Sequence, residues 1–165
     1  MAEAAESLEV MAKRRKTAWD ASKSAAGNAR LVLPHLAAAY IQASKKLSDG
    51  DPSVRNIHKF RLKTKRFRYT LELFRPCCGP GLEPRLEALR CIQQGLGEIS
   101  DCVMTRRLLP GRKGIRPRQL ARFSKFLDSR IAEKTASLLH HLERSLRAPG
   151  QQRWWEDYLA RFPSR

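Results

Sequence analysis

The segment from Val54 to Arg75 constrains the fold most, because a helical pattern there carries eight Lys/Arg residues and a single acid. Two stripes recur along it at helical spacing. The first must pack into a core, which requires neighbouring elements to cover it. The second gathers cations, which repel one another unless an anion lies against them. The first stripe contains Ile57, Phe60, Thr64, Phe67, Leu71 and Phe74, and the second contains His58, Arg61, Lys65, Arg68, Tyr69 and Glu72.

Clusters of Gly and Pro divide the chain into helix-length segments. We predict four long helices, at 21–48, 52–75, 83–109 and 117–147, and a short fifth near 151–161. No β-branched alternation occurs, so no sheet is expected. The sequence therefore predicts an all-α fold, an antiparallel four-helix bundle with a short additional C-terminal helix.

Each remaining long segment has its own apolar seam, and local residues predict how some helices begin. We expect Pro34 to delay or kink the first helix, and Asp51 to cap the second ahead of Pro52. Trp154 and Trp155 should anchor the terminal helix. The seams are Leu33, Leu36, Tyr40, Ala43 and Leu47 in the first segment; Leu89, Ile92, Leu96, Ile99 and Val103 in the third; and Leu120, Phe123, Leu127, Ile131, Leu138 and Leu142 in the fourth.

Length and composition bound the class of protein. The 165 residues suit one domain, which we place at 18–165 behind a flexible basic segment at 1–17. The chain has 33 Lys and Arg against 16 acids, a formal charge of +17, so its partner should be a polyanion. The four cysteines form no metal or disulfide framework, and neither a signal peptide nor a membrane-spanning run is evident. We expect reduced thiols in an intracellular, cytoplasmic protein.

Two sets of side chains are candidates for anion binding. We favour an anion-binding face on 52–75 over a merely solvated one, with Glu72 holding Arg68 in place. If 117–147 lies beside that helix, the two form a basic trough; the alternative is that they point to solvent in different directions. The candidates are His58, Arg61, Lys65, Arg66, Arg68 and Tyr69, with Arg118, Arg122, Lys125, His140 and Arg144 from the later segment.

The sequence offers no catalytic constellation. Phosphate-loop, nucleophile-elbow and zinc motifs are missing, so we predict no catalytic residue, no metal site and no cofactor. Gly95 and Gly97 suggest places where another helix backbone approaches closely. Asp101 is expected to pair with a cation of the bundle.

The spacing of residues in two successive helices resembles the CHAD family, the conserved-histidine α-helical domains. The resemblance implies a helical bundle with a basic central cavity that binds inorganic polyphosphate, without catalysis, often beside polyphosphate-metabolising enzymes. It places His58, Arg61, Lys65, Arg68 and Tyr69 in the pore wall. The resemblance covers roughly 54–109 and rests on His58-x-x-Arg61-x-x-x-Lys65-Arg66-x-Arg68-Tyr69-x-x-Glu72-x-Phe74 and on Leu89-x-x-Ile92-Gln93-x-x-Leu96-Gly97-x-x-x-Asp101.

One departure from that family shapes our expectations. Its members usually contain two four-helix repeats, whereas one copy is found here, so the chain reads as a half-length version or one whose second half is lost. We expect a homodimer that restores the pore. The rivals are an RNA- or DNA-binding helical protein, an acid-anhydride hydrolase or phosphotransferase, and, weakest, a membrane-surface protein. We expect no membrane partner, and the resemblance adds polyphosphate granules as a location.

Overall fold

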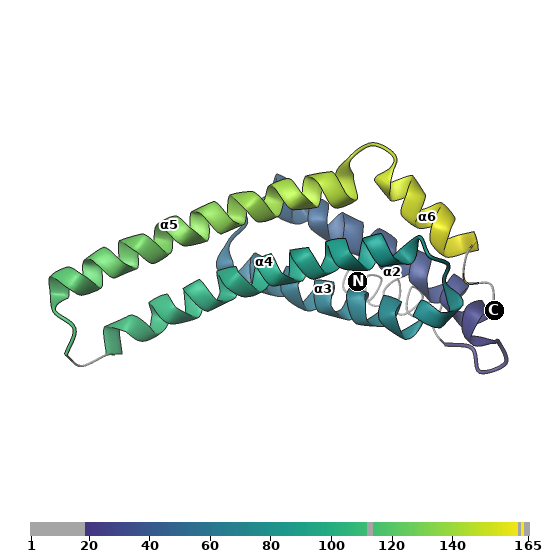
Figure 1. The fold of residues 1–165 in the computed structure, drawn as a ribbon, viewed down its shortest axis with the longest axis horizontal. Coiled ribbons are helices and arrows are strands. Elements are labelled where there is room, and N and C mark those ends of the chain that lie inside the picture. The colour runs from purple at the N-terminus through teal and green to yellow at the C-terminus, as the bar shows by residue number, and fades with distance from the viewer. Residues whose placement is uncertain (1–18, 112–113, 162, 164–165) are drawn as a thin grey trace, which may run out of the picture.

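The computed structural model describes residues 19–111, 114–161 and 163, and every regular element in them is helical (Figure 1). The proposed flexible segment at 1–17 lies outside the described residues. The long helices are α2 (Ala25–Asp49), α3 (Val54–Leu73), α4 (Leu82–Leu108) and α5 (Pro117–Leu142), followed by the short α6 (Gln151–Arg161). Short 3₁₀ turns occur at Arg75–Cys77 and Leu109–Gly111, and a π-helical turn at Glu143–Arg147. The all-α prediction is confirmed.

The helices form a more open arrangement than a closed four-helix bundle. In order of packing, α6 lies on α2, α2 on α3, α3 on α4, and α4 on α5. The π-helical turn contacts both α2 and α6, and Arg147 in it forms an ion pair with Asp49 at 3.0 Å. The first half of α5 and the end of α4 extend beyond α2 and α3 as a two-helix hairpin (Figure 1).

Two details of how helices begin differ from expectation. Ser24 caps α2 by accepting a hydrogen bond from Gly27 N at 3.1 Å, so the helix starts well before Pro34 and contains it. The start is therefore not delayed. Helix α3 begins at Val54 with Ser53 at the N-cap, whereas Asp51 lies outside and offers its carbonyl to Asn56 at 2.9 Å. Asp51 is not the cap because the irregular stretch after α2 continues through Ser53 before the helix begins.

The core is an aromatic cluster covered by leucine and isoleucine. Tyr40 stacks on Phe60 and Phe67 with ring centroids 5.2 and 4.8 Å apart, and Phe67 packs against Trp155 at 5.4 Å. The Tyr40 hydroxyl and the Thr64 hydroxyl hydrogen-bond at 3.1 Å, which satisfies both polar groups where they are buried. The first stripe of α3 is buried throughout, as are the five seam residues of α4. Trp155 is 1 % exposed, so the anchoring of α6 is confirmed.

The predicted seam of α5 is wrong at one end. Leu127, Leu138 and Leu142 are buried, but Phe123 is 44 % exposed. It stacks on Phe126, itself 54 % exposed, with ring centroids 6.1 Å apart. Helical spacing places Phe123 correctly on the helix, yet α2 and α3 end before reaching it, so only α4 is available to cover this part of α5 (Figure 1).

Replacing Phe67 with Ala should lower the free energy of unfolding by about 3–5 kcal/mol, because the side chain is 3 % exposed and supports both Tyr40 and Trp155. Urea denaturation followed by circular dichroism measures this. Phe126→Ala is the matched control and should change stability by no more than about 0.5 kcal/mol. Similar losses in the two variants would contradict the assigned core.

Candidate anion-binding face

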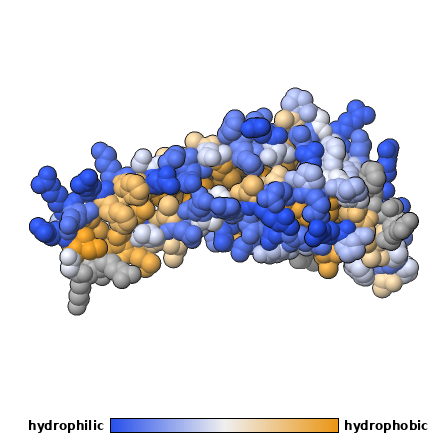
Figure 2. Space-filling view, in the orientation of Figure 1, coloured by the Kyte–Doolittle hydropathy of each residue, from blue (hydrophilic) through white to orange (hydrophobic). Residues whose placement is uncertain are grey.

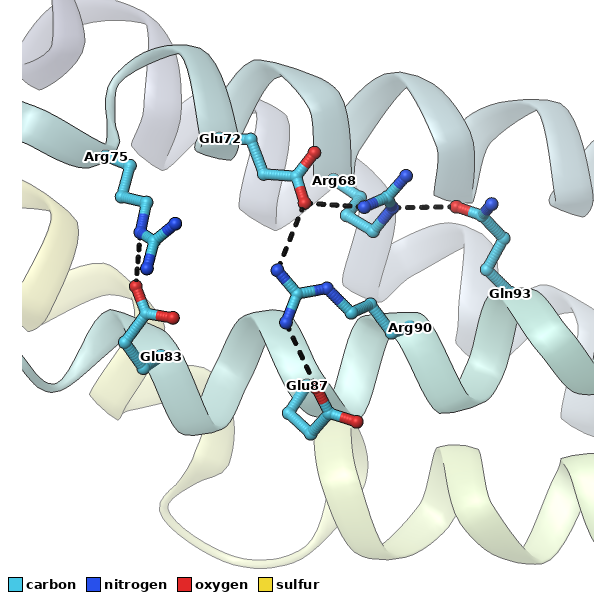
Figure 3. Close-up of polar contacts among 7 residues, drawn as sticks. All are labelled: Arg68, Glu72, Arg75, Glu83, Glu87, Arg90 and Gln93. Atoms are coloured by element: carbon cyan, nitrogen blue, oxygen red, sulfur yellow. Dashed lines mark hydrogen bonds and ion pairs between the residues drawn. The ribbon is translucent and has the colours of Figure 1, made fainter.

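The face where α3 meets α4 holds an antiparallel ladder of polar contacts, which we call the α3–α4 seam. The 3₁₀ turn after α3 is tied to α4 by Arg75 and Glu83 at 2.5 Å, and one step along the ladder Arg90 contacts Glu72 at 3.5 Å (Figure 3). Further along, Arg68 Nε donates to Gln93 Oε1 at 2.8 Å. At the far end His58 and Ser100 line the same cavity. The seam consists of His58, Arg61, Lys65, Arg68 and Glu72 from α3, and Arg90, Gln93, Gly97 and Ser100 from α4.

Glu72 is the acceptor at the centre of this ladder. Its Oε1 accepts from Arg68 Nη1 at 2.5 Å and lies 3.5 Å from Arg90 Nη2 (Figure 3). The predicted contact between Glu72 and Arg68 is confirmed. Hydrogen bonding to Glu87, with Glu72 contributing next, holds the pKa of Arg90 above its ordinary value. The Arg68 guanidinium also lies over the Tyr69 ring, 4.4 Å from its centroid, so Arg68 is held from three sides.

Arg61 and Lys65 differ from these arginines. Both are half-buried, and neither has a hydrogen-bond or ion-pair partner among the residues that the structure describes. The Arg61 Nε atom is buried without a partner, an arrangement that costs free energy unless a further acceptor is supplied. Because they lie along α3 between Arg68, which contacts Gln93, and His58, which lines the cavity with Ser100, antiparallel packing places them opposite the stretch of α4 that contains Gly97.

Gly97 leaves open space rather than admitting a neighbouring helix. A Cβ atom built there meets nothing within 4 Å, and one at Gly95 meets only Leu138 Cδ1 at 4.0 Å. No backbone atom of a neighbouring helix lies within 4 Å of either Cβ position, so the expectation of close backbone approach at these glycines is wrong. Asp101, one turn further, is exposed and forms no ion pair within the described ranges, so its expected pairing is also wrong.

The cavity at the end of the seam has a volume of about 880 Å³ and an apolar floor. Ile99 and Val103 form part of that floor, while His58, Lys59 and Arg107 bring cationic groups to its edge. His58 is exposed and lies at this edge. The seam therefore runs from paired arginines, past two unpaired cations, into an open basic cavity.

The remaining candidates are distributed over other surfaces. Arg66 lines a different cavity, with Tyr40 and Lys63, on the α2 side of α3. The α5 candidates lie on its outer surface, opposite the Leu127, Leu138 and Leu142 face that packs toward α4 and the core. Because α3 and α5 each pack chiefly on α4, the chain does not form the expected trough between them. Exposed on α5 and the following turn are Arg118, Arg122, Lys125, His140 and Arg144.

Sequence reasoning missed Gln93 and Arg90 as partners of the α3 residues. Their contacts depend on the register between two helices, which periodicity within one helix does not contain. Gln93 had appeared only as a position of the family resemblance. Over the described part of the chain, no cluster of three or more His, Cys, Asp or Glu residues could hold a metal ion, and all four cysteines are free thiols.

Comparison with known proteins adds one decisive finding: a family model described as the CHAD domain matches residues 2–110. The chain belongs to the CHAD domain family. The match contains α2, α3 and α4, hence the whole seam, and it begins within the segment proposed as a flexible extension. No match was found among curated proteins or among solved structures. Within the described residues, no helix is long and apolar enough to cross a membrane.

Gly97→Ala should raise the free energy of unfolding by about 0.5–1 kcal/mol, because alanine favours the helix interior and the new methyl group meets open space. Thermal and urea denaturation measure the change. Gly81→Ala, where a Cβ would lie 3.0 Å from the Tyr158 ring, serves as the contrasting substitution and should not stabilise. A destabilised Gly97→Ala would contradict the open seam.

Proposed function

We propose that this CHAD domain binds inorganic polyphosphate along the α3–α4 seam, without catalysis. The observation that carries the proposal is the contrast in pairing along the seam. Arg68, Arg75 and Arg90 each engage a carboxylate, whereas Arg61 and Lys65 have no anionic partner in the described residues. An anion placed across from Gly97 would meet both unpaired cations.

The chemistry of the side chains suits phosphate groups. A guanidinium group can give two N–H donors to one phosphate, and a lysine ammonium adds a mobile point charge. His58 at the cavity edge could extend the contact to a further phosphate of a chain. Glu72 is already engaged by Arg68 and Arg90, so the role proposed for it is to position Arg68 and not to activate water.

Arg61→Ala combined with Lys65→Ala should weaken binding of long-chain polyphosphate by about 2–4 kcal/mol, roughly 30- to 1000-fold, at two charge-assisted contacts. Fluorescence anisotropy or calorimetry measures the dissociation constant. The matched control is Lys63→Ala with Arg66→Ala, which removes the same charge from the same helix on its α2 side. That control should stay within about fivefold of the parent, because its charges act only through a screened field.

Equal affinity of the parent and the Arg61/Lys65 variant would overturn the proposal. The rival ligand is RNA or DNA, which the net charge favours equally. Competition separates the two: polyphosphate should displace a bound oligonucleotide, and the oligonucleotide should displace polyphosphate poorly. Partners that metabolise polyphosphate belong to the same proposal by family association.

We further propose that two copies associate across this face. Helix α3 carries an exposed apolar stripe beside the seam: Leu62 is 53 %, Tyr69 50 % and Leu73 72 % exposed. A second copy would bury this stripe and enclose the unpaired cations in a shared channel, as a two-repeat architecture would. Polyphosphate would offset the repulsion between two strongly basic chains.

Light scattering after size exclusion should therefore show dimers that form or strengthen when polyphosphate is present. Leu62→Glu with Leu73→Glu should abolish them, because four carboxylates would then be buried in the interface. Leu31→Glu, on the exposed side of α2, is the control and should leave the dimer intact. A monomer under both conditions would contradict the dimer without affecting the seam assignment.

A further inference from the structure

The projecting end of the α4–α5 hairpin, residues 104–111 and 114–126, combines exposed apolar side chains with positively charged ones and contains no acidic residue. We refer to it as the hairpin end. Between Met104 and Phe126 the sequence contains no Asp or Glu; the nearest acids are Asp101 and Asp128. The described cations in this stretch are all exposed: Arg106, Arg107, Arg116, Arg118, Arg122 and Lys125.

Large apolar side chains are exposed among these cations. Figure 2 shows hydrophobic surface gathered near one end of the molecule, over the α4–α5 hairpin, with hydrophilic surface around it. Phe123 and Phe126 stack with an interplanar angle of 10°, which holds two exposed rings together. The exposed apolar residues are Met104 at 52 %, Leu108 at 58 %, Ile115 at 39 %, Phe123 at 44 % and Phe126 at 54 %.

We propose that the hairpin end docks onto an anionic lipid surface, with Phe123 and Phe126 inserted among the lipids and the surrounding arginines on the headgroup phosphates. Phe123 and Phe126 lie outside the α3–α4 seam, although Met104 and Arg107 of the hairpin end also line the cavity where the seam ends, and the proposal goes beyond polyphosphate binding. Apolar side chains that enter the interface and cations that contact anionic headgroups are the two contributions from which reversible membrane association is built.

The shape of the molecule favours a surface over a pocket-forming partner. The hairpin projects past α2 and α3, so its end can reach a flat bilayer with no other element in the way (Figure 1). The cavity of about 880 Å³ between α3 and α4 is not lined by Phe123 or Phe126, so the two rings are not part of that groove. Two exposed aromatic rings at the projecting end of a hairpin suit insertion between mobile lipids.

Charge and side-chain chemistry favour an anionic lipid surface over two other partners, a second copy of the chain and a single-stranded nucleic acid. Two copies meeting through their hairpin ends would bring like charges together, which opposes association. Single-stranded nucleic acid would use the rings for stacking, but Met104, Leu108 and Ile115 offer bases no aromatic surface. Arg106 is paired with Asp128 at 2.8 Å, whereas Arg118 and Arg122 form no ion pair in the described part of the chain and remain available for headgroups.

Sedimentation with vesicles of phosphatidylcholine and phosphatidylglycerol, compared with phosphatidylcholine alone, tests the proposal on the full chain. The parent should bind the anionic vesicles far better than the neutral ones. Phe123→Ser with Phe126→Ser should reduce the partition coefficient by about tenfold or more, because two exposed rings no longer enter the interface. Leu31→Ser removes an exposed apolar side chain from α2, away from the hairpin end, and should bind like the parent.

Arg118→Gln with Arg122→Gln should lower the partition coefficient by about tenfold. Arg153→Gln with Arg161→Gln, which removes the same charge from α6, should lower it by about threefold at most. The headgroup analogue glycerol phosphate, added free, should compete only weakly, which separates headgroup chemistry from an intact bilayer. Polyphosphate affinity of the Phe123/Phe126 variant should equal that of the parent, so failure here is distinguishable from failure of the seam proposal.

The proposal is overturned if the parent does not bind anionic vesicles, or if it binds neutral vesicles equally. It is also overturned if the Phe123/Phe126 variant sediments like the parent. If instead that variant loses affinity for single-stranded RNA while keeping its affinity for vesicles, the hairpin end is a nucleic-acid surface and the lipid assignment is wrong.

Discussion

The rest of the structure depends on the crowding of cations along α3, a helix whose other side must stay in the core. Phe60, Phe67 and Leu71 fix the rotation of this helix, and that rotation turns Arg61, Lys65 and Arg68 toward α4. Like charges at this spacing oppose helix formation and packing. Glu72, Gln93 and the α4 carboxylates relieve part of the repulsion by engaging the arginines at one end of the seam. The relief stops before Arg61 and Lys65, which leaves a local excess of positive charge at these two residues.

Most of the fold follows from the Gly and Pro clusters that separate the helices and from the helical periodicity of the apolar residues. Gly and Pro clusters placed the helices close to their observed limits, and the α3 and α4 stripes were correct because helices cover both of them along most of their length. The prediction that Phe123 is buried was wrong for a different reason. Periodicity assigns a residue to one face of its helix, but it does not say how far the neighbouring helices extend. The same limit applies to Gly97, where a missing side chain can mean close approach or open space.

The candidate site was partly predictable. Arg61, Lys65, Arg68 and Glu72 share one face of one helix, so the spacing alone brings them together. The partnership of Arg68 with Gln93 and the separation of α3 from α5 depend on how helices pack, which no single-helix pattern contains. As a result, the trough expected between α3 and α5 is not formed, because α4 lies between these helices, and the α5 cations lie on the outer surface of α5.

The central claim is that Arg61 and Lys65 hold the polyanion directly, and the salt dependence of polyphosphate binding tests it most directly. Each cation that neutralises a phosphate releases counterions, so the logarithm of the association constant falls linearly with the logarithm of salt concentration. By analogy with single-stranded nucleic acid, removing both cations should make that slope shallower by about 1.4. Unchanged slopes for the parent and the Arg61→Ala/Lys65→Ala variant would contradict the account, because the two side chains would then make no contact with phosphate.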